Sequence, residues 1–285
     1  MQRLRTVIDY IHERLGDKLT VDDLAAVAGA SKFHFHRQFT AEFGISVYRY
    51  VQLARLKRAV SKLAYRPWES ILDIALESGY DGPEAFSRAF KQVMGQTPTE
   101  FRAEPNWLQY GRALQPVDEM RKVNMKQQWQ KHNVRIVDVP DTPIAMLEHR
   151  GDPAHIGDTV RRFIAWRKGV KLSPKTSATY NILFDDPSET PADEFRLGIC
   201  AATQTPVAPN NAGVKNSVIP GGRCAVLRHT GSDHTFGDAV TYLYAVWLAA
   251  SGEQPRDFPL YCERVTFFPD VPEHEAITDI YLPLS

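Results

Sequence analysis

The stretch SKFHFHRQF, residues 31–39, contains two histidines two positions apart, which raises the question of a metal site. On a helix, which advances about 100° per residue, His34 and His36 point about 200° away from each other. A helical pair that binds one ion needs the spacing i, i+4, so these two side chains cannot hold the same metal. The sequence therefore predicts no metal site here, and no other motif in the chain predicts a cofactor.

The same predicted helix has an apolar face and an opposite face that mixes aromatic and basic side chains. Phe35 and Phe39 lie at i, i+4 and predict a core stripe, whereas Phe33, His36 and Arg37 lie on the other side. In a DNA major groove, arginine binds guanine acceptors and an apolar side chain contacts the thymine methyl group. This face is expected to contact DNA, unless Phe33 packs on the preceding helix and the two polar side chains are merely solvated.

A second copy of this unit follows about fifty residues later. Gly29 recurs as Gly79 and then, after one inserted residue, Phe35, Arg37, Phe39 and Gly44 recur as Phe86, Arg88, Phe90 and Gly95. Each copy predicts a helix, a glycine turn and a second helix that ends at a glycine, which describes a helix-turn-helix. Ser31 is expected to cap the second helix of the first copy.

The outer face of the second copy differs from that of the first. It carries Glu84, Ser87 and Arg88, so a repeated core predicts two reading heads with different base preferences. Between the heads lies a stretch without acidic residues, whose basic residues are Arg49, Arg55, Lys57, Arg58, Lys62 and Arg66. A connecting helix with these side chains is expected to follow the phosphate backbone and to supply salt-dependent affinity.

The overall composition is that of a folded protein with two domains. The chain has 285 residues, 43% of them hydrophobic, and a formal net charge of zero, which argues against a generic nucleic-acid binder. No apolar run approaches the roughly 20 residues needed to span a bilayer, and the first residues are unlike a signal peptide. We expect a cytoplasmic protein with no membrane partner, whose three cysteines are reduced and buried.

The pattern changes after residue 103. Residues 106–133 are polar and irregular and predict a linker, and beyond them short β-like runs alternate with two helical stretches. Here too the chain repeats itself, now at an offset of eighty residues, with His149 and Gly151 among the residues matched by His229 and Gly231. The fold class is therefore an all-α double helix-turn-helix domain followed by an α+β domain of two pseudo-symmetric strand-helix-strand halves. A ligand cleft is expected between the halves.

One strand of the second domain, YCERVTFF, places a carboxylate among apolar side chains. Alternation puts Tyr261, Glu263, Val265 and Phe267 on one face. A buried carboxylate is costly unless it is paired. Glu263 therefore predicts either an internal basic partner or a site for a cationic ligand.

The first domain resembles the AraC/XylS family of bacterial transcription regulators. The resemblance covers residues 1–105 and rests on LTVDDLAAVAGASKFHFHRQF and on GY followed by FSRAFK, GQTP and FR. It implies two helix-turn-helix units on adjacent major-groove segments, with DNA contacts from Phe33, His36, Arg37, Pro83, Glu84 and Arg88. One departure is GPE at the start of the second recognition helix, where relatives often carry a serine cap.

Residues 134–285 resemble a GyrI-like domain, on the motifs YNILFDDP, HTGSDHTFGDAVTYLYAVWL and ITDIYLPL. The resemblance implies a cleft in which a glutamate matching Glu263 attracts hydrophobic cations. The aromatic residues expected to line this cleft are Trp166, Tyr180, Tyr244, Trp247, Tyr261, Phe267 and Tyr281. Aromatic rings bind cations through their quadrupoles, and a carboxylate adds Coulombic attraction.

Together these features predict a transcription regulator, not an enzyme. It is expected to act as an activator that binds promoter DNA, a small-molecule effector and RNA polymerase. The alternatives are that the second domain hydrolyses electrophilic drugs with its glutamate, or that it binds another protein.

Overall fold

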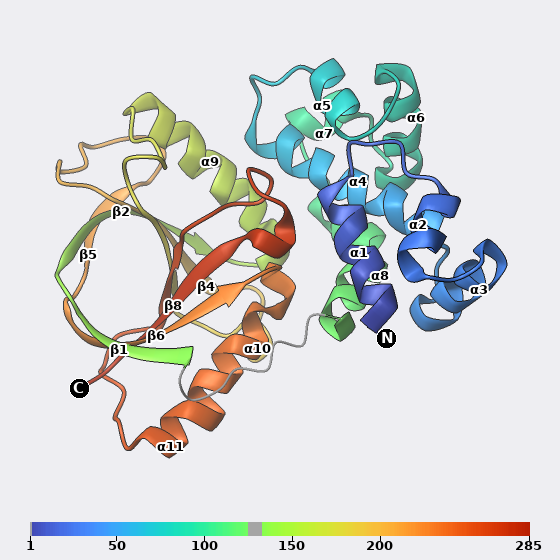
Figure 1. Ribbon diagram of the computed structural model, residues 1–285. Coiled ribbons are helices and arrows are strands. Elements are labelled where there is room, and N and C mark those ends of the chain that lie inside the picture. Colours follow the sequence, from blue (N-terminus) through green and yellow to red (C-terminus); the bar gives the residue numbers. More distant parts are fainter. Residues whose placement is uncertain (1, 125–132) are drawn as a thin grey trace. The chain divides into compact units, whose positions relative to one another are not determined.

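The computed structural model describes residues 2–124 and 133–285, and it divides the chain into two compact units (Figure 1). The first unit comprises Met1–Lys126 and Phe268–His274, and the second comprises Gln127–Phe267 and Glu275–Ser285. The helices of the predicted DNA-binding domain lie in the first unit, and all of the described strands lie in the second. The expected order of an all-α domain and an α+β domain is confirmed.

The first unit consists of short helices that alternate with capped turns. Its helices are α1 (Gln2–Glu13), α2 (Val21–Ala28), α3 (Lys32–Phe43), α4 (Val47–Tyr65), α5 (Ile71–Glu77), α6 (Pro83–Met94), α7 (Pro98–Ala103) and α8 (Trp107–Asn124). The two predicted helix-turn-helix copies are α2–α3 and α5–α6. Ser31 caps α3 as expected, because its side chain accepts a hydrogen bond from the backbone of His34.

The two copies share their stop signals as well as their core. Gly44 ends α3 with φ 71°, and Gly95 ends α6 with φ 72°, both in the left-handed region that glycine adopts without strain. Ser46 and Thr97 then cap the next helix of each copy, α4 and α7. The repeat read from the sequence is therefore a repeat of local structure.

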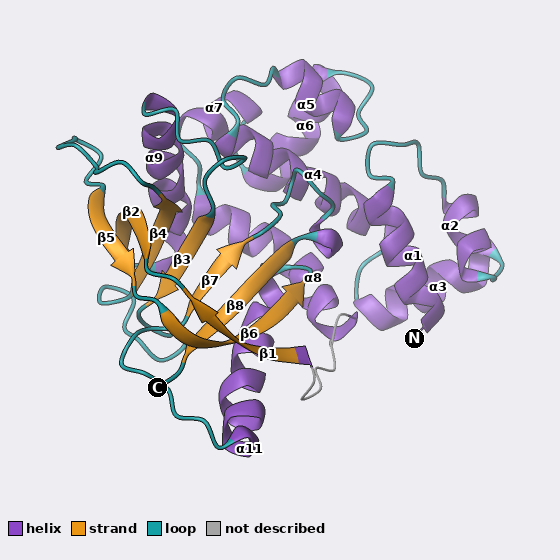
Figure 2. Ribbon diagram, turned by 60° about the vertical axis from the view of Figure 1, so that its left-hand side comes forward, coloured by secondary structure: helices purple, strands orange, loops and turns teal. Residues whose placement is uncertain are grey.

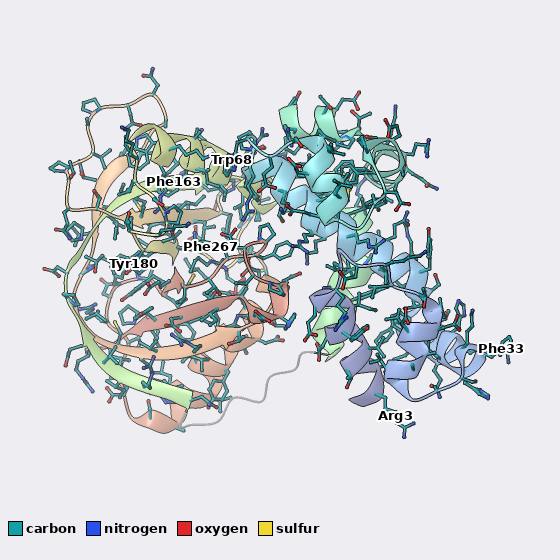
Figure 3. The ribbon with its side chains drawn as sticks, turned by 45° about the horizontal axis from the view of Figure 1, so that its top comes forward. Arg3, Phe33, Trp68, Phe163, Tyr180 and Phe267 are labelled. Atoms are coloured by element: carbon teal, nitrogen blue, oxygen red, sulfur yellow. The ribbon has the colours of Figure 1, made fainter. Side chains whose placement is uncertain are left out.

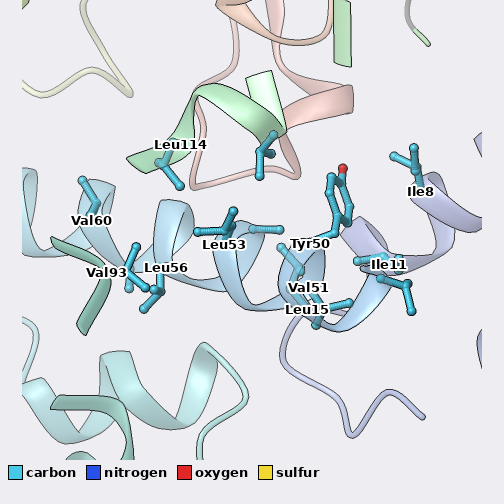
Figure 4. Packing of buried hydrophobic residues seen from close by; sticks show 14 of the residues in the cluster. Ile8, Ile11, Leu15, Tyr50, Val51, Leu53, Leu56, Val60, Val93 and Leu114 are labelled. Carbon is cyan, nitrogen blue, oxygen red and sulfur yellow. The ribbon is translucent and has the colours of Figure 1, made fainter. Parts of the chain in front are cut away.

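Helix α4 lies at the centre of the first unit and is not a surface connector. Buried side chains surround it, which is the pattern of a helix enclosed by others. Figure 4 shows part of this packing, in which residues of α1, α4, α6 and α8 meet; the α4 residues labelled there are Tyr50, Val51, Leu53, Leu56 and Val60. The expected connecting helix between the two copies is present, but its apolar side chains are covered on several sides, so only part of its surface is accessible.

The prediction that residues 106–133 form a linker is wrong for most of that range. Helix α8 occupies Trp107–Asn124, and Leu114 and Val117 are fully buried in the core of the first unit. Their spacing, i and i+3, places both on the face that packs against α4. The abundant polar residues concealed this short apolar stripe. The rest of the predicted linker, residues 125–132, lies outside the described residues.

The second unit is built on one eight-stranded sheet that curls (Figures 1 and 2). The strands are β1 (Val134–Val139), β2 (Thr142–Arg150), β3 (Thr179–Leu183), β4 (Arg196–Ala202), β5 (Lys215–Ile219), β6 (Gly222–Thr230), β7 (Tyr261–Arg264) and β8 (Ile277–Pro283). Their order is β1-β6-β8-β7-β3-β4-β2-β5. Helix α9 (Ile156–Gly169) belongs to the first half, and α10 (Phe236–Thr241), the π-helical stretch η4 (Tyr242–Leu248) and α11 (Ala249–Ser251) belong to the second.

The strand order confirms the two pseudo-symmetric halves. It also shows that each half contributes one strand to the sheet of the other half. The halves meet where β3 pairs with β7, and the order of equivalent strands is mirrored about that pair. Strand β1 precedes β2 in the chain but pairs with β6, and β5 precedes β6 but pairs with β2. Gly151 and Gly231 occupy matching positions with φ 121° and 125°, so the two halves also turn alike.

The strand pairing assigns the side chains to two faces of the sheet. One continuous row of cross-strand neighbours is Leu147, Ile199, Asn181, Cys262, Ile280 and Leu227. Its aliphatic members pack against α9 or against the α10–η4 stretch, so this is the helix-covered face. Residues one position away along each strand lie on the opposite face.

Sequence patterns did not identify β3, β4 and β5 as strands. Their sequences, TYNIL, RLGICAA and KNSVI, do not alternate clearly between apolar and polar residues, so the period-two signal was too weak. The three cysteines lie on β4, β6 and β7 and are buried and unbridged, as expected. None of the described helices is long and apolar enough to cross a membrane.

The burial of α8 leads to a prediction about stability. Leu114→Ala should lower the free energy of unfolding of the first unit by about 2–5 kcal/mol, because it leaves a cavity beside α4. Leu108 on the same helix is 49% exposed, so Leu108→Ala is the matched control and should change stability by less than about 0.5 kcal/mol. Urea denaturation measures both, and equal losses would mean that α8 does not belong to this core.

Candidate DNA-binding surface and effector site

The outer face of α3 has the exposure predicted for a reading surface. Phe35 and Phe39 are completely buried, whereas Phe33 is 82% exposed, and His36 and Arg37 are exposed beside it. Figure 3 shows Phe33 pointing away from the ribbon. The alternative in which Phe33 packs on the preceding helix is therefore wrong.

Helix α6 presents the equivalent residues, with Phe86 and Phe90 buried and Arg88 exposed. Its start differs physically from that of α3. Gly82 offers no side-chain cap, Pro83 occupies the first turn, and Glu84 is exposed at the positive end of the helix dipole. Ser87 is half-buried. The second head therefore has a carboxylate where the first has a phenylalanine.

Of the six basic residues predicted to follow phosphate, four have partners inside the first unit, namely Arg55, Lys57, Lys62 and Arg66; the last two both bind Glu69. Arg55 is tied to the end of α1: its Nε donates to the Leu15 carbonyl at 2.9 Å and its Nη2 donates to the Asp17 carbonyl at 2.6 Å. Burial lowers the pKa of Arg55 from its usual value. The side chain also lies close to Gly79, where an added Cβ would come within 2.7 Å of the guanidinium. Arg55 therefore links the segment that follows α1 to the turn at Gly79 of the second helix-turn-helix copy, and its guanidinium is not available to DNA.

Lys57 is the second such correction. Only 6% of this residue is exposed, and its Nζ donates to Glu273 Oε1 at 2.9 Å within the same unit. A lysine in this position is not available to a phosphate. Arg49 and Arg58 are half-buried, and Arg49 Nη1 donates to Gln52 at 2.7 Å, so these two remain candidates for backbone contacts.

The second unit contains a row of polar side chains on the face of the sheet opposite the helices. The row consists of Arg228 on β6, Asp279 on β8, Glu263 on β7 and Tyr180 on β3, each paired with the next across the strands. We call these four residues the charged row. It crosses the junction of the two halves, because Glu263 and Tyr180 are the pair that joins β7 to β3.

Tyrosines surround the Glu263 carboxylate. Tyr281 donates a hydrogen bond from its hydroxyl to Glu263 Oε2 at 3.3 Å, and its ring stacks on Tyr261 with 4.8 Å between ring centroids. Tyr180 lies directly across from Glu263, and its ring is 6.3 Å from that of Tyr261. Within the described part of the chain, Glu263 forms no ion pair. Of the two possibilities left open by the sequence, an internal basic partner for Glu263 is therefore not observed.

These surroundings shift the protonation of the site. Burial is the largest effect and raises the pKa of Glu263 above its usual 4.5. The Tyr281 hydrogen bond and the charge of Arg228 act to lower this pKa, and the charge of Asp279 acts to raise it. Burial and the nearby Glu263 carboxylate raise the pKa of Tyr180 to about 12. Burial likewise raises the pKa of Tyr261 and of Tyr281. The tyrosines are therefore neutral hydrogen-bond donors near pH 7, and one half-buried carboxylate faces them.

The second carboxylate of the row is already occupied. Arg228 donates to both oxygens of Asp279, from Nε and from Nη2, each at 2.7 Å. Asp279 lies in the segment ITDIYLPL and was not predicted to be a site residue. Alternation along β8, with Asp279 and Tyr281 two positions apart, was the signal that places both on one face.

Some of the aromatic residues expected around Glu263 lie elsewhere. Trp166 stacks on Phe163 in the layer between α9 and the sheet, and Trp247 is buried between the η4 stretch and the sheet. Both therefore lie on the helix-covered face. Tyr244 belongs to the η4 stretch of that same layer and is partly exposed. The prediction that these three line the Glu263 site is wrong, because a sequence does not reveal against which face a helix packs.

Phe267 also falls outside the predicted alternation. Strand β7 ends at Arg264, since the backbone N–H groups of Val265 and Thr266 both bond to the Ile277 carbonyl. Two residues that face one partner interrupt a regular ladder, so the period-two pattern does not extend to Phe267. Tyr180, Tyr261 and Tyr281 are the expected aromatic residues that the structure brings to Glu263.

Other chemistry is weakly supported among the described residues. No group of three or more His, Cys, Asp or Glu side chains there is arranged to hold a metal ion. Burial raises the pKa of Cys200 and of Cys224, so neither thiol is a nucleophile at neutral pH.

Two families of known proteins match this chain. The model of the GyrI-like small molecule binding domain matches residues 132–285, and the model of a helix-turn-helix domain matches residues 24–104. A protein of Escherichia coli K12 described as probable transcriptional regulator YgiV is 38% identical over 154 residues, which is 54% of this chain and 96% of that protein.

Two further matches cover other portions. The right origin-binding protein of Escherichia coli K12 is 34% identical over 143 residues, 50% of this chain and 46% of that protein. The crystal structure of a transcriptional regulator described as AraC-type, from Chromobacterium violaceum, is 27% identical with a TM-score of 0.35. The match covers 37% of this chain and 93% of that one.

The contact between Tyr281 and Glu263 leads to a prediction. Tyr281→Phe removes a hydrogen bond to the ionised carboxylate and should raise the pKa of Glu263 further, because that bond lowers it. Carbon-13 NMR titration of the glutamate carboxyl groups measures the shift, with Glu263→Gln used to assign the signal. Tyr244→Phe, in the helical layer, is the control and should leave the signal where it is.

Proposed function

Because the chain belongs to the family defined by the GyrI-like small molecule binding domain and carries an AraC-type helix-turn-helix domain, we propose that it activates transcription when a small hydrophobic cation binds at Glu263. The observation that carries the sensing role is the Glu263 carboxylate, half-buried among tyrosines and without an ion pair in the described residues. A desolvated carboxylate beside aromatic rings attracts a positive charge that can shed its water easily. Cations with delocalised charge and apolar surface meet that condition.

The two outward faces of the helix-turn-helix copies support the DNA-binding role. Phe33, His36 and Arg37 form the first reading face, and Glu84 and Arg88 belong to the second. Their backing residues are fully buried, so each recognition helix presents its outer side chains from a rigid base. Arg49 and Arg58 are the candidates for phosphate contacts. Promoter DNA and RNA polymerase are the macromolecular partners that this role requires, and the cytoplasm is where it is performed.

The chemistry around Glu263 favours binding over catalysis. The neighbouring carboxylate, Asp279, is held by Arg228 through both oxygens, and the thiols on this face have raised pKa values. Glu263 would therefore have to activate water without a second free carboxylate or an ionised thiol, with only neutral tyrosine hydroxyls beside it. We propose that the domain senses its ligand without turnover.

The reading heads can be tested after a DNA site has been selected from a random pool with the wild-type protein. Arg37→Ala should weaken binding to that site by about 1–3 kcal/mol and relax preference at one base pair, if Arg37 pairs with a guanine. Arg88→Ala tests the second head in the same way. Electrophoretic mobility shifts and competition with single-base variants measure both effects.

Arg112 provides the control for this experiment. It is exposed on α8 rather than on either recognition helix, so Arg112→Ala removes one positive charge without touching a reading face. Wild-type affinity and base preference in both Arg37→Ala and Arg88→Ala would contradict the assignment of the reading heads.

The effector site can be tested with a fluorescent hydrophobic monocation. Glu263→Gln keeps the shape of the side chain but removes the charge, and it should weaken binding by at least about tenfold. Wild-type affinity should fall as the pH is lowered through the raised pKa of Glu263, since only the ionised carboxylate attracts the cation. The affinity of Glu263→Gln should change little over the same range.

Two outcomes would redirect the function. Identical titration curves for the wild type and Glu263→Gln would remove the cation site. Chemical conversion of the bound ligand, detected by mass spectrometry, would favour the hydrolase alternative. A neutral analogue of the dye serves as the control for purely hydrophobic binding, which should not depend on Glu263.

A further inference from the structure

The charged row contains two carboxylates in direct cross-strand register. Glu263 on β7 is paired with Asp279 on β8, and both lie on the face opposite the helices. Side chains in such positions have Cβ atoms about 4.5–5.5 Å apart, and like charges there repel each other. Without compensation, these two residues would form a doubly negative site.

Compensation comes from the next strand. Arg228 on β6 is paired with Asp279, and its guanidinium binds both carboxylate oxygens in a fork, Nε to Oδ1 and Nη2 to Oδ2, each at 2.7 Å. The Asp279 side chain is 8% exposed, whereas that of Arg228 is 52% exposed. Arg228 therefore neutralises the buried Asp279 carboxylate from the solvent side. The charge of Glu263 is left without an ion-pair partner among the described residues.

We infer that the Arg228–Asp279 pair sets the charge selectivity of the site, so that it accepts singly charged cations and disfavours doubly charged ones. This inference rests on the proposed binding of cations at Glu263 and adds the class of ligand. The three charged members of the row sum to one negative charge, which one positive charge satisfies. A second positive charge on the ligand meets the Arg228 guanidinium two strands away, about 10 Å across the sheet.

A second arginine on β6, Arg223, takes no part in the charged row. Arg223 lies on the opposite face of β6, because the two positions are an odd number of residues apart. It pairs with Glu253 at 2.9 Å, remote from Glu263. Arg223 therefore offers a matched control with the same strand, the same residue type and a similar ion pair.

The experiment compares two flat aromatic probes of similar size, N-methyl-phenylpyridinium with one charge and methyl viologen with two. Isothermal titration at about pH 8 gives their affinities for the full-length protein and for Arg228→Met, which retains the side-chain stem without the charge. The preference for the monocation over the dication should fall by roughly tenfold or more in Arg228→Met, since it exposes a second negative charge to the ligand. Arg223→Met should keep the wild-type preference.

A double variant provides a second test in case Arg228→Met folds poorly with Asp279 left unpaired. Arg228→Met with Asp279→Asn has one carboxylate again and should regain the preference for the monocation. Circular dichroism verifies the folding of each variant.

The outcomes separate this inference from the proposed function. If monocation binding requires Glu263 but Arg228→Met leaves the ratio of the two affinities unchanged, the selectivity role is overturned and the cation site stands. If neither probe depends on Glu263, the cation site itself fails. A ratio that shifts toward the dication in Arg228→Met and returns in the double variant supports the role of the pair.

Discussion

The antiparallel pairing of β3 with β7 is the interaction on which the second unit depends. It joins two half-sheets that are each completed by a strand from the other, with β1 added to β6 and β5 added to β2. Because side chains alternate along a strand, a slip of one residue in this pair would move Glu263 to the helix-covered face. The register that joins the halves aligns Tyr180 with Glu263, and the β7–β8 and β6–β8 pairings extend the row to Asp279 and Arg228. The hydrogen-bonded ladders that stabilise the sheet therefore also assemble the candidate site.

In the first unit the corresponding constraint is the burial of α4. This helix packs among α1, α6 and α8, so several of its basic residues are used inside the protein. Lys62 binds Glu69 at 3.0 Å and also binds Glu77, and Arg55 holds the end of α1. A cluster of basic residues in the sequence is thus divided between structural partners and the few side chains that remain accessible. This packing gives the recognition helices a rigid support, but it leaves fewer basic side chains on the surface to contact phosphate. In the proposed recognition of DNA, base contacts from α3 and α6 therefore contribute more than phosphate contacts from α4.

The sequence was most informative where structure depends on neighbours in the chain. The recurrence of Phe35 and Phe39 as Phe86 and Phe90 predicted both helix-turn-helix copies, and helical periodicity correctly separated buried from exposed side chains on α3. It failed where a weak local signal was outweighed by distant contacts. Polar residues concealed the two-residue apolar stripe of α8, and β3 to β5 lack the clear alternation that distinguishes a strand from a loop. Trp166 and Trp247 were recognised as aromatic residues of a binding domain, but nothing local shows that their helices pack behind the sheet.

The sequence by itself determined that this protein has a duplicated helix-turn-helix domain, a duplicated α+β domain and a carboxylate among apolar strand residues. These conclusions rest on repeats and on side-chain period, which are properties of consecutive residues. Only the tertiary structure decided which charges meet. Arg228 and Asp279 are 51 residues apart and are brought together by the pairing of β6 with β8, and Arg55 reaches a carbonyl 40 residues earlier in the chain. Such partners depend on strand order and helix packing, so the charge that remains at Glu263 is a property of the folded chain.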